Sequence, residues 1–530
     1  MNIYLLIQIS VIILACIGLN NLSGKLGVPT LLGFILLGVL LGNHGVISLG
    51  YIGFPLAERI CEIALIFIMF YGGFGTRWDA VKPIVGVAGL LSTLGVVITA
   101  LITGVFCHLV LRWGWAESLL LGSVVSSTDA ASVFSILKSK RLNLKNYSAP
   151  ILEVESGSND PIGHMLTITM ISVLNVSASP SRLVLNVLLE IVLGAFLGVV
   201  IAQLGAFGLR KMRFRTEGFI SLYILTVAML AYAIPVSLHG NGFLSVYIVG
   251  VMMGNKYYAN KKMLVHFFDG ITTLMEVLVF FILGALAKPS GFSSAILPAL
   301  GIFLCMLILA RPLAVNAVLL PFRRFSFQQR RLIGFSGLRG AASIVFAILA
   351  VNGTYLGIDF FNIVFCIVLL SMSLQGTLLP LMSRRLDMID RNGNVLRTFN
   401  DFDDDDVFFG KLNIEAGSSW EGKSIRELSL PEGIIIALIF RNGERILPSG
   451  SVVIQAGDLV ITLSKVYYGS GSRIKEKTIK ADSRRVGKAI RENPGSSIII
   501  MIKRGEECII PNRDTILEAG DRLVILDLQD

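Results

Sequence analysis

Thirteen apolar segments follow one another along residues 1–385, and they constrain the fold of this chain more than any other feature. A helix of about 20 apolar residues is long enough to cross the hydrocarbon core of a bilayer. The chain is 54% hydrophobic and 15% charged, whereas average soluble proteins are roughly 25% charged. We therefore predict a polytopic α-helical membrane domain over residues 1–385, followed by ordinary soluble sequence.

The basic residues of the connecting loops predict an orientation. Alternate connections carry twenty Lys and Arg residues, whereas the opposite set carries only four, which are Arg59, Arg112, Arg182 and Lys288. A positive-inside bias of this size puts the N-terminus outside and the C-terminus in the cytoplasm. The bias also accounts for much of the net charge of +10, so no nucleic-acid partner is needed. Because the N-terminus lacks the basic start of a signal peptide, we expect the first segment to stay as a helix among membrane lipid.

Two aspartates, Asp129 and Asp160, lie in the middle of long apolar stretches. A charged side chain at the bilayer centre costs at least ~2.5–3.5 kcal/mol, so such a residue normally faces a partner or a water-filled cavity. The motif around Asp160 is Glu153-Val-Glu-Ser-Gly-Ser-Asn-Asp-Pro161, and small polar residues precede Asp129. The pattern predicts a membrane path for a cation or a proton.

Helical spacing suggests how the groups around Asp160 are arranged. Residues four apart share a helix face, so Ser156 pairs with Asp160, and Glu155 pairs with Asn159. Oxygen ligands of this kind suit a hard monovalent cation, and a carboxylate can hold a proton instead. An acid that binds either a cation or a proton, never both, is the minimal chemistry of exchange.

A second Gly-rich stretch, Ser336-Gly-Leu-Arg-Gly-Ala-Ala-Ser343, interrupts the twelfth apolar segment. Interrupted helices in corresponding halves are typical of inverted-repeat transporters with a site near the membrane midplane. The buried charge of Arg339 needs an anion, and we predict that Glu155 is its partner.

The remaining polar groups predict less. For Glu62, Glu190, Glu217 and Glu276, a structural and a functional role are both open. The six cysteines lack metal spacing and are expected to pack inside helices. The scattered histidines do not predict a zinc site. We expect no cofactor, and no nucleophile–base arrangement of an enzyme is present.

Several motifs together resemble those of the NhaP-type cation/proton antiporters, and most closely the bacterial potassium/proton antiporters with a TrkA-C domain. They are Ser127-Thr-Asp-Ala-Ala-Ser-Val-Phe-Ser135, the motif ending in Asn159-Asp-Pro161, Phe268-Asp-Gly270 and Gly337-Leu-Arg-Gly-Ala341. The resemblance implies a fold of about 13 transmembrane helices with inverted repeats and crossed interrupted helices. It also implies a homodimer in the bacterial inner membrane.

The resemblance assigns roles to particular residues. Asp160 becomes the exchanging carboxylate with Asn159 as its motif partner, and Asp129 and Thr128 lie at the helix crossing. Glu155 and Ser156 complete the cation site, with Arg339 paired to Glu155. An Asn before the Asp, as here, goes with electroneutral exchange in the wider superfamily.

The tail contains two similar units after an acidic linker at 386–404. Ile-rich strands with Asn-Gly or Arg-Gly turns, each preceded by a short helical stretch at 424–428 or 484–491, predict an α+β regulatory domain. Residues 405–466 and 474–530 resemble the TrkA-C domain. A ligand sensor and a dimerisation module are both open, and a nucleotide such as cyclic di-AMP is one candidate ligand.

The combined prediction is a secondary antiporter that exchanges cytoplasmic K+ or Na+ for H+ and is regulated by its tail. The alternative is a TrkA-C-gated cation channel, although the Thr-Val-Gly-Tyr-Gly filter of potassium channels is absent from the sequence. Oxygen ligands alone do not separate K+ from Na+.

Overall fold

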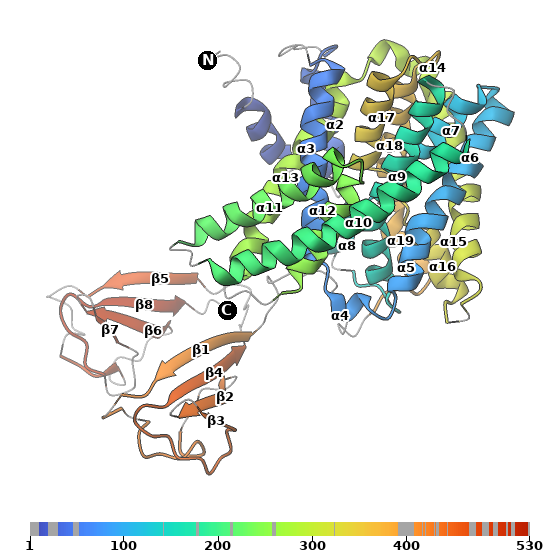
Figure 1. Cartoon of the computed structure of the whole chain (residues 1–530). Coiled ribbons are helices and arrows are strands. Elements are labelled where there is room, and N and C mark those ends of the chain that lie inside the picture. Colours follow the sequence, from blue (N-terminus) through green and yellow to red (C-terminus); the bar gives the residue numbers. More distant parts are fainter. Residues whose placement is uncertain are drawn as a thin grey trace. The chain divides into compact units, whose positions relative to one another are not determined.

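The computed structural model describes most of residues 10–390 and 407–527. It divides into two units, Met1–Asp401 and Phe402–Asp530, which Figure 1 draws. The first unit has gaps at 20–29, 46–51, 141, 176–179, 213–215, 257–260 and 323. The second has gaps at 416, 419, 429, 431–433, 442–443, 466–472, 480–486, 491–496, 505–506 and 510–514. Most of the predicted acidic linker therefore lies outside the described residues.

The first unit is built of helices. After Ser10–Leu19, they are α2 (Thr30–Leu41), α3 (Phe54–Gly75), α4 (Trp78–Val81), α5 (Val85–Leu90), α6 (Val96–Leu111), α7 (Trp115–Val124), α8 (Ala130–Ser139), α9 (Ser148–Asn175), α10 (Pro180–Lys211), α11 (Glu217–Ser237), α12 (Gly242–Gly254), α13 (Lys261–Leu286), α14 (Phe292–Cys305), α15 (Arg311–Leu319), α16 (Phe327–Phe335), α17 (Ala341–Gly353), α18 (Phe360–Leu370) and α19 (Gly376–Arg385). Six helical stretches in the described residues are long and apolar enough to cross a membrane, and shorter apolar helices accompany them. The predicted number of 13 spans stays a prediction.

Three long helices contain a π-helical turn. The turn η1 (Leu91–Gly95) joins α5 to α6, η3 (Met306–Ala310) joins α14 to α15, and η4 (Ser371–Gln375) joins α18 to α19. A 3-10 turn, η2 (Pro289–Gly291), precedes α14. Because π-turns widen the helix locally and frequently mark functional sites, they draw attention to the helices around α7 and α16.

The helices form two bundles. Bundle A contains α2, α3 and α10–α13, and bundle B contains α5–α9 and α14–α19. The two bundles meet chiefly where α17 packs against α3 and α13. Figure 1 shows α10 and α11 running across the near face of this unit.

Glycines let the helices of bundle A approach closely. A Cβ atom on Gly284 of α13 would lie 2.8 Å from the backbone nitrogen of Val39 and 2.9 Å from the Cα of Gly38 on α2. A Cβ atom on Gly250 of α12 would lie 3.2 Å from the Cα of Gly73 on α3. Small residues at helix crossings are the usual means of close packing in membranes, where dispersion contacts replace the hydrophobic drive.

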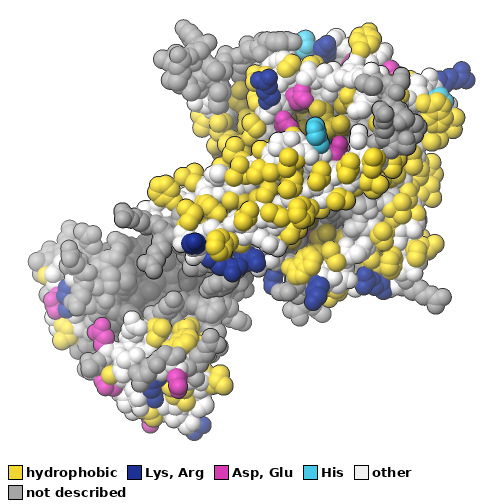
Figure 2. Space-filling model, in the orientation of Figure 1, with side chains coloured by type: hydrophobic (Ala, Val, Ile, Leu, Met, Phe, Trp, Pro, Cys, Tyr) yellow, Lys and Arg dark blue, Asp and Glu magenta, His cyan; other side chains and the backbone are white. Residues whose placement is uncertain are grey.

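The surface of the first unit is apolar where lipid is expected. Figure 2 shows hydrophobic side chains spread across the visible face of the helices, with Lys and Arg gathered toward its edges. On α10, Val192, Phe196 and Leu204 are 62%, 63% and 63% exposed. An apolar surface this extensive would be a liability in water and is normal against a bilayer.

The second unit contains two four-stranded antiparallel sheets. The first has the order β1-β4-β2-β3 and the second β5-β8-β6-β7. Their strands are β1 (Val407–Asn413), β2 (Ile434–Arg441), β3 (Glu444–Ile446), β4 (Leu459–Lys465), β5 (Arg473–Thr478), β6 (Ser497–Arg504), β7 (Glu507–Ile509) and β8 (Arg522–Asp527). Both sheets have a register shift at the same place in the second strand, between Ile436 and Leu438 and between Ile499 and Met501.

The same ion pair, between a buried aspartate and a partly exposed arginine, occurs in both sheets. The Nε and Nη2 atoms of Arg441 donate to Asp458 at 2.8 Å each, and those of Arg504 donate to Asp521 at 2.8 and 2.9 Å. The hydrogen bonds from Arg441 and from the Gln455 backbone amide hold the pKa of Asp458 below its usual value. The repetition agrees with the two similar units predicted from the sequence.

One prediction for the tail is wrong. Ser424–Leu428 forms turns, because Ser424 pairs with Val453 in an isolated β-bridge instead of starting a helix. Its counterpart in the second sheet is the bridge between Ala489 and Ile516. Part of the other predicted helical stretch, residues 484–486 and 491, lies outside the described residues. The described tail is therefore richer in strand and turn than expected.

Candidate functional site

The break between α7 and α8 meets the middle of α9. The amide nitrogen of Asn159 donates to the Thr128 hydroxyl at 2.6 Å. The Ser156 hydroxyl donates to the Thr128 carbonyl at 2.7 Å. Asn159 and Ser156 are buried, at 0% and 8% exposure, so these contacts satisfy backbone and side-chain groups that the interrupted helix leaves without intrahelical partners.

Asp160 joins this cluster through a serine that the sequence analysis did not single out. The Ser127 hydroxyl lies within hydrogen-bonding distance of the Asp160 carboxylate and 3.1 Å from the amide oxygen of Asn159. A hydroxyl has one proton, so Ser127 can donate to only one of them at a time. Asp160 itself is half-buried. Its position in the sequence motif, directly beside Thr128 and Asp129, was the one available signal for Ser127.

Asp129 lies where the two interrupted helices cross. Its backbone amide donates to the Leu338 carbonyl at 2.8 Å, and its carboxylate accepts from the Ser132 amide at 3.2 Å and hydroxyl at 2.6 Å. The carboxylate thus caps the start of α8. It also lies so close to Gly340 that a Cβ atom there would collide with it. Asp129 therefore faces the starts of both α8 and α17, where helix dipoles favour a negative charge.

Arg339 supplies the opposite charge at this crossing. Its Nη1 donates to the carbonyls of Ser126 and Ser127 at 2.7 and 2.6 Å, just beyond the end of α7. Its backbone amide donates to the Ser371 hydroxyl at 3.0 Å. The guanidinium, 2% exposed, thereby stabilises carbonyls at a helix C-terminus, where positive charge is favoured.

The predicted pairing of Arg339 with Glu155 is wrong. Glu155 forms its ion pair with Arg311 of α15, at 2.6 Å between Oε1 and Nη1, with side-chain exposures of 1% and 3%. Arg311 in turn lies against Gly337, where a Cβ atom would come within 2.8 Å of its Nε. Arg311 is a charge within an apolar segment, which is a signal in the sequence, but the motifs around Asp129, Asp160 and Arg339 do not include it.

The structure thus brings together most of the predicted site residues. Around the α7–α8 break lie Asp160, Asn159, Ser156, Thr128 and Asp129. Arg339 reaches the same break from the other interrupted helix. Glu155 faces Arg311 instead. The cluster offers carboxylate, hydroxyl, amide and carbonyl oxygens, a set that suits a hard monovalent cation, and one carboxylate able to hold a proton.

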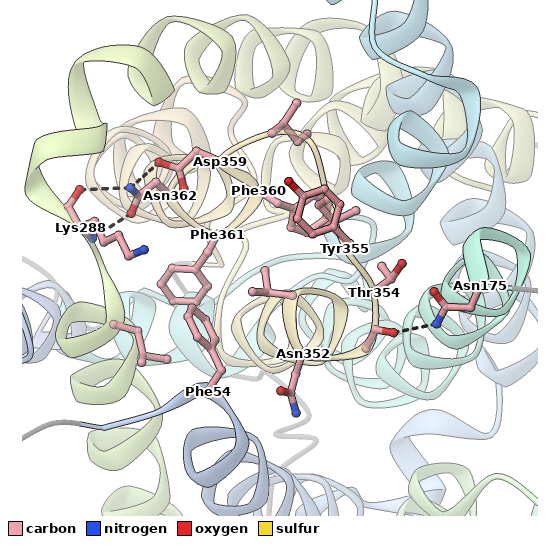
Figure 3. A pocket seen from close by; sticks show the side chains of 15 residues that line it. Phe54, Asn175, Lys288, Asn352, Thr354, Tyr355, Asp359, Phe360, Phe361 and Asn362 are labelled. Atoms are coloured by element: carbon pink, nitrogen blue, oxygen red, sulfur yellow. Dashed lines mark hydrogen bonds between the residues drawn. The ribbon is translucent and has the colours of Figure 1, made fainter.

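A cavity of about 590 Å³ lies at the other end of α17. Figure 3 shows its lining, in which Asn362 exchanges hydrogen bonds with the backbone of Lys288 at 3.0 and 3.1 Å. Phe54 and Phe361 meet edge to face there, with ring centroids 5.3 Å apart. None of the predicted site residues lines this cavity, so it is separate from the cluster at the helix crossing.

Two family profiles match the chain. The profile described as "Sodium/hydrogen exchanger, transmembrane" matches residues 11–385. The TrkA-C domain profile matches twice, at residues 411–463 and 475–526. The first match covers the helical unit and the second covers the two sheets.

Curated relatives and a solved structure are also similar to the chain. A K(+)/H(+) antiporter NhaP2 of Shewanella sp. (strain MR-4) is 35% identical over 460 residues, covering 84% of this chain and 79% of the relative. A K(+)/H(+) antiporter NhaP of Alkalimonas amylolytica is 32% identical over 470 residues, covering 87% and 81%. The structure of the sodium proton antiporter MjNhaP1 from Methanocaldococcus jannaschii superposes with a TM-score of 0.62 at 23% identity, covering 72% of this chain and 99% of that one. At that identity the last likeness concerns the fold alone.

Proposed function

The chain belongs to the sodium/hydrogen exchanger family, and from that premise we propose that it exchanges K+ or Na+ for H+ through Asp160. It is a multi-pass membrane antiporter with a TrkA-C regulatory region. The names of its relatives favour K+ over Na+ as the transported cation. A gated channel is not favoured, because the family and the named relatives are exchangers.

The observation that carries the proposed role of Asp160 is its set of neighbours. Its carboxylate faces the Ser127 hydroxyl beside the break in α7–α8, where further oxygens of Thr128 and Ser156 gather. Among the residues that the structure describes, no Lys or Arg forms an ion pair with Asp160. A proton or an alkali cation can therefore neutralise this carboxylate, and one carboxylate cannot be neutralised by both at once.

Ser127 lets the site accept either occupant. When Asp160 is ionised, the Ser127 hydroxyl donates to it. When Asp160 is protonated, its own O–H can donate to Ser127, whose proton then turns to the amide oxygen of Asn159 at 3.1 Å. The Ser127 hydroxyl thus has an acceptor for its proton in either protonation state of Asp160, which lowers the cost of burying that hydroxyl in both.

The other buried charges support electroneutral exchange. Arg311 is neutralised by Glu155 at 2.6 Å, and Arg339 is held by carbonyls at 2.6 and 2.7 Å. Neither partnership involves Asp160. If only Asp160 changes its occupant during a cycle, one H+ moves for one monovalent cation, and no net charge crosses the membrane.

The finer architecture belongs to the same proposal. We propose 13 spans with inverted repeats, supported by the two broken helices α7–α8 and α16–α17 and by π-turns in the helix before each of them. The interface between bundles A and B would then move during alternating access. We further propose a homodimer in the bacterial inner membrane, with the N-terminus outside and the tail in the cytoplasm.

For the tail we propose regulation of exchange. Two TrkA-C units with boundaries near 405–466 and 474–530, tethered by the linker 386–404, would bind a ligand and change the rate of transport. A nucleotide such as cyclic di-AMP and a cation are the candidate ligands. Binding titrations of the tail against both classes test this, and absence of binding to either would favour a dimerisation module.

Asp160→Asn tests the central proposal. Purified protein in proteoliposomes should lose proton movement driven by K+, Na+ or Rb+, because Asn cannot exchange a proton. Asp387→Asn is the matched control, since Asp387 is 82% exposed in a surface pair with Lys145 and should keep wild-type exchange. Full exchange by the Asp160 variant would remove this residue from the mechanism. An imposed voltage should leave the wild-type rate unchanged if exchange is electroneutral.

A further inference from the structure

Helix α13 carries a second row of polar side chains that the exchanging cluster does not include. Asp269, Thr272 and Glu276 are three and four residues apart, so they share one face of the helix. The helix belongs to bundle A, whereas Asp160 belongs to bundle B. It packs against α17, whose start lies beside Asp129.

Electrostatic interactions connect this row to the exchanging carboxylate. Glu276 interacts with Asp269 on its own helix and with Asp129 across the bundle interface. Asp129 in turn interacts with Asp160. Asp269 is exposed, whereas Glu276, Asp129 and Asp160 are half-buried. These pairwise interactions link the row on α13 to the carboxylates at the helix crossing.

The acids on α13 have few partners among the described residues. The Tyr71 hydroxyl donates to Asp269 at 3.0 Å, but in the described part of the chain no Lys or Arg pairs with Asp269 or Glu276. The nearby buried arginines have other partners, since Arg311 binds Glu155 and Arg339 binds carbonyls. Mobile cations can thus neutralise this row.

Thr272 provides an independent sign of a ligand. It is 7% exposed, and its hydroxyl has no hydrogen-bond partner among the described residues. A buried polar group without a partner costs about 1–3 kcal/mol, so native structures usually satisfy it. Thr272 lies between the two acids along the same helix face. A cation held there, or its water of hydration, would supply the missing contact.

We propose that Asp269, Thr272 and Glu276 form an access site that holds a monovalent cation before it reaches Asp160. The site would concentrate the cation beside the moving interface, as acidic clefts focus oppositely charged substrates. In the orientation proposed above, Asp269 lies toward the cytoplasmic end of α13. The inference rests on the proposed function but concerns cation capture instead of exchange.

Glu276→Gln should weaken capture without stopping exchange. In proteoliposomes, we expect the KM for K+ to rise about tenfold, while the maximal rate stays within about twofold. Asp269→Asn should give a smaller rise because Asp269 is exposed, and Thr272→Val should raise KM, with Thr272→Ser restoring it. Glu190→Gln is the matched control, because this half-buried acid lies on α10, away from the row on α13. The KM of this variant should stay at the wild-type value.

Two results would overturn the access site. An unchanged KM in Glu276→Gln is the first. Complete loss of exchange in folded Glu276→Gln is the second, because it would place Glu276 in the exchanging centre itself. If Glu276→Gln does not fold, the access site is tested with Asp269→Asn and Thr272→Val. An unchanged KM for K+ in both variants would refute the site. Failure of the exchange proposal is separate, since it shows as retained transport in Asp160→Asn.

Discussion

The ion pair between Arg311 and Glu155 makes a quantitative prediction about stability. Its charged atoms are 2.6 Å apart and nearly fully buried. At an effective dielectric constant of about 20, two unit charges at this distance attract by about 6 kcal/mol. Much of that attraction is offset by the cost of removing both ions from water, but removing only one partner leaves the other charge buried and alone. Such single changes typically cost about 3–5 kcal/mol.

A double-mutant cycle measures this coupling. Arg311→Met and Glu155→Leu should each lower the unfolding temperature of the purified protein in detergent, whereas the double variant should recover most of the loss. We expect a coupling free energy of about 3 kcal/mol, since the double variant contains no uncompensated charge. Size-exclusion chromatography after heating gives the folded fraction at each temperature.

The comparison cycle uses Arg339→Met with Glu155→Leu. Because Arg339 binds the Ser126 and Ser127 carbonyls and forms no ion pair with Glu155, its coupling to Glu155 should be weaker than that of Arg311. Additive losses in the Arg311 cycle would refute the observed pairing. A larger coupling for Arg339 than for Arg311 would instead support the pairing predicted from the sequence.

Two further variants test the packing of bundle A and of the tail. Gly284→Ala should overpack the α2–α13 contact, which costs about 1–3 kcal/mol and lowers the unfolding temperature. Gly270→Ala is the control on the same helix, because its added Cβ meets open space. Equal effects of the two variants would contradict the close α2–α13 contact. In the tail, hydrogen bonds from Arg441 hold the pKa of Asp458 below its usual value. Ionised Asp458 therefore stabilises the fold at pH values above its pKa in the unfolded chain, about 3.9. This stabilisation is lost as the pH falls through the lower pKa of Asp458 in the folded protein. Asp458→Asn should therefore speed amide hydrogen exchange in β2–β4 at neutral pH and reduce the dependence of this exchange on acid pH. Exchange in β6–β8 should stay unchanged. Equal protection in variant and wild type would argue against a stabilising pair.

Local patterns predicted some features well. The Gly-rich and Ser-rich stretches around Asp129 and Arg339 indicated interrupted helices, and the structure has breaks at both places. Glycine and small polar residues destabilise a continuous helix wherever they occur, so this signal is contained in a few adjacent residues. The helical stretch expected at 424–428 was wrong because a bridge between Ser424 and Val453 competes with it.

Ion pairs, in contrast, cannot be predicted from neighbouring residues in the sequence. Arg311 and Arg339 are both buried cations within apolar segments, and composition alone makes either a partner for Glu155. Which one reaches it depends on how α15, α17 and α9 pack, and those helices are far apart in the chain. The same holds for Ser127, whose neighbours belong to α9, and for Glu276, whose interaction with Asp129 crosses between the two bundles.

The amino-acid sequence by itself determined that this is a helical membrane protein with carboxylates in its apolar core and a repeated strand-rich tail. Hydropathy, helical spacing and turn residues act over a few neighbouring positions, so they can be read along the chain. Only the tertiary structure decided which arginine neutralises Glu155, which hydroxyl serves Asp160 and which acids approach one another across the bundles. Those contacts depend on distances between helices, and packing of the whole unit sets these distances.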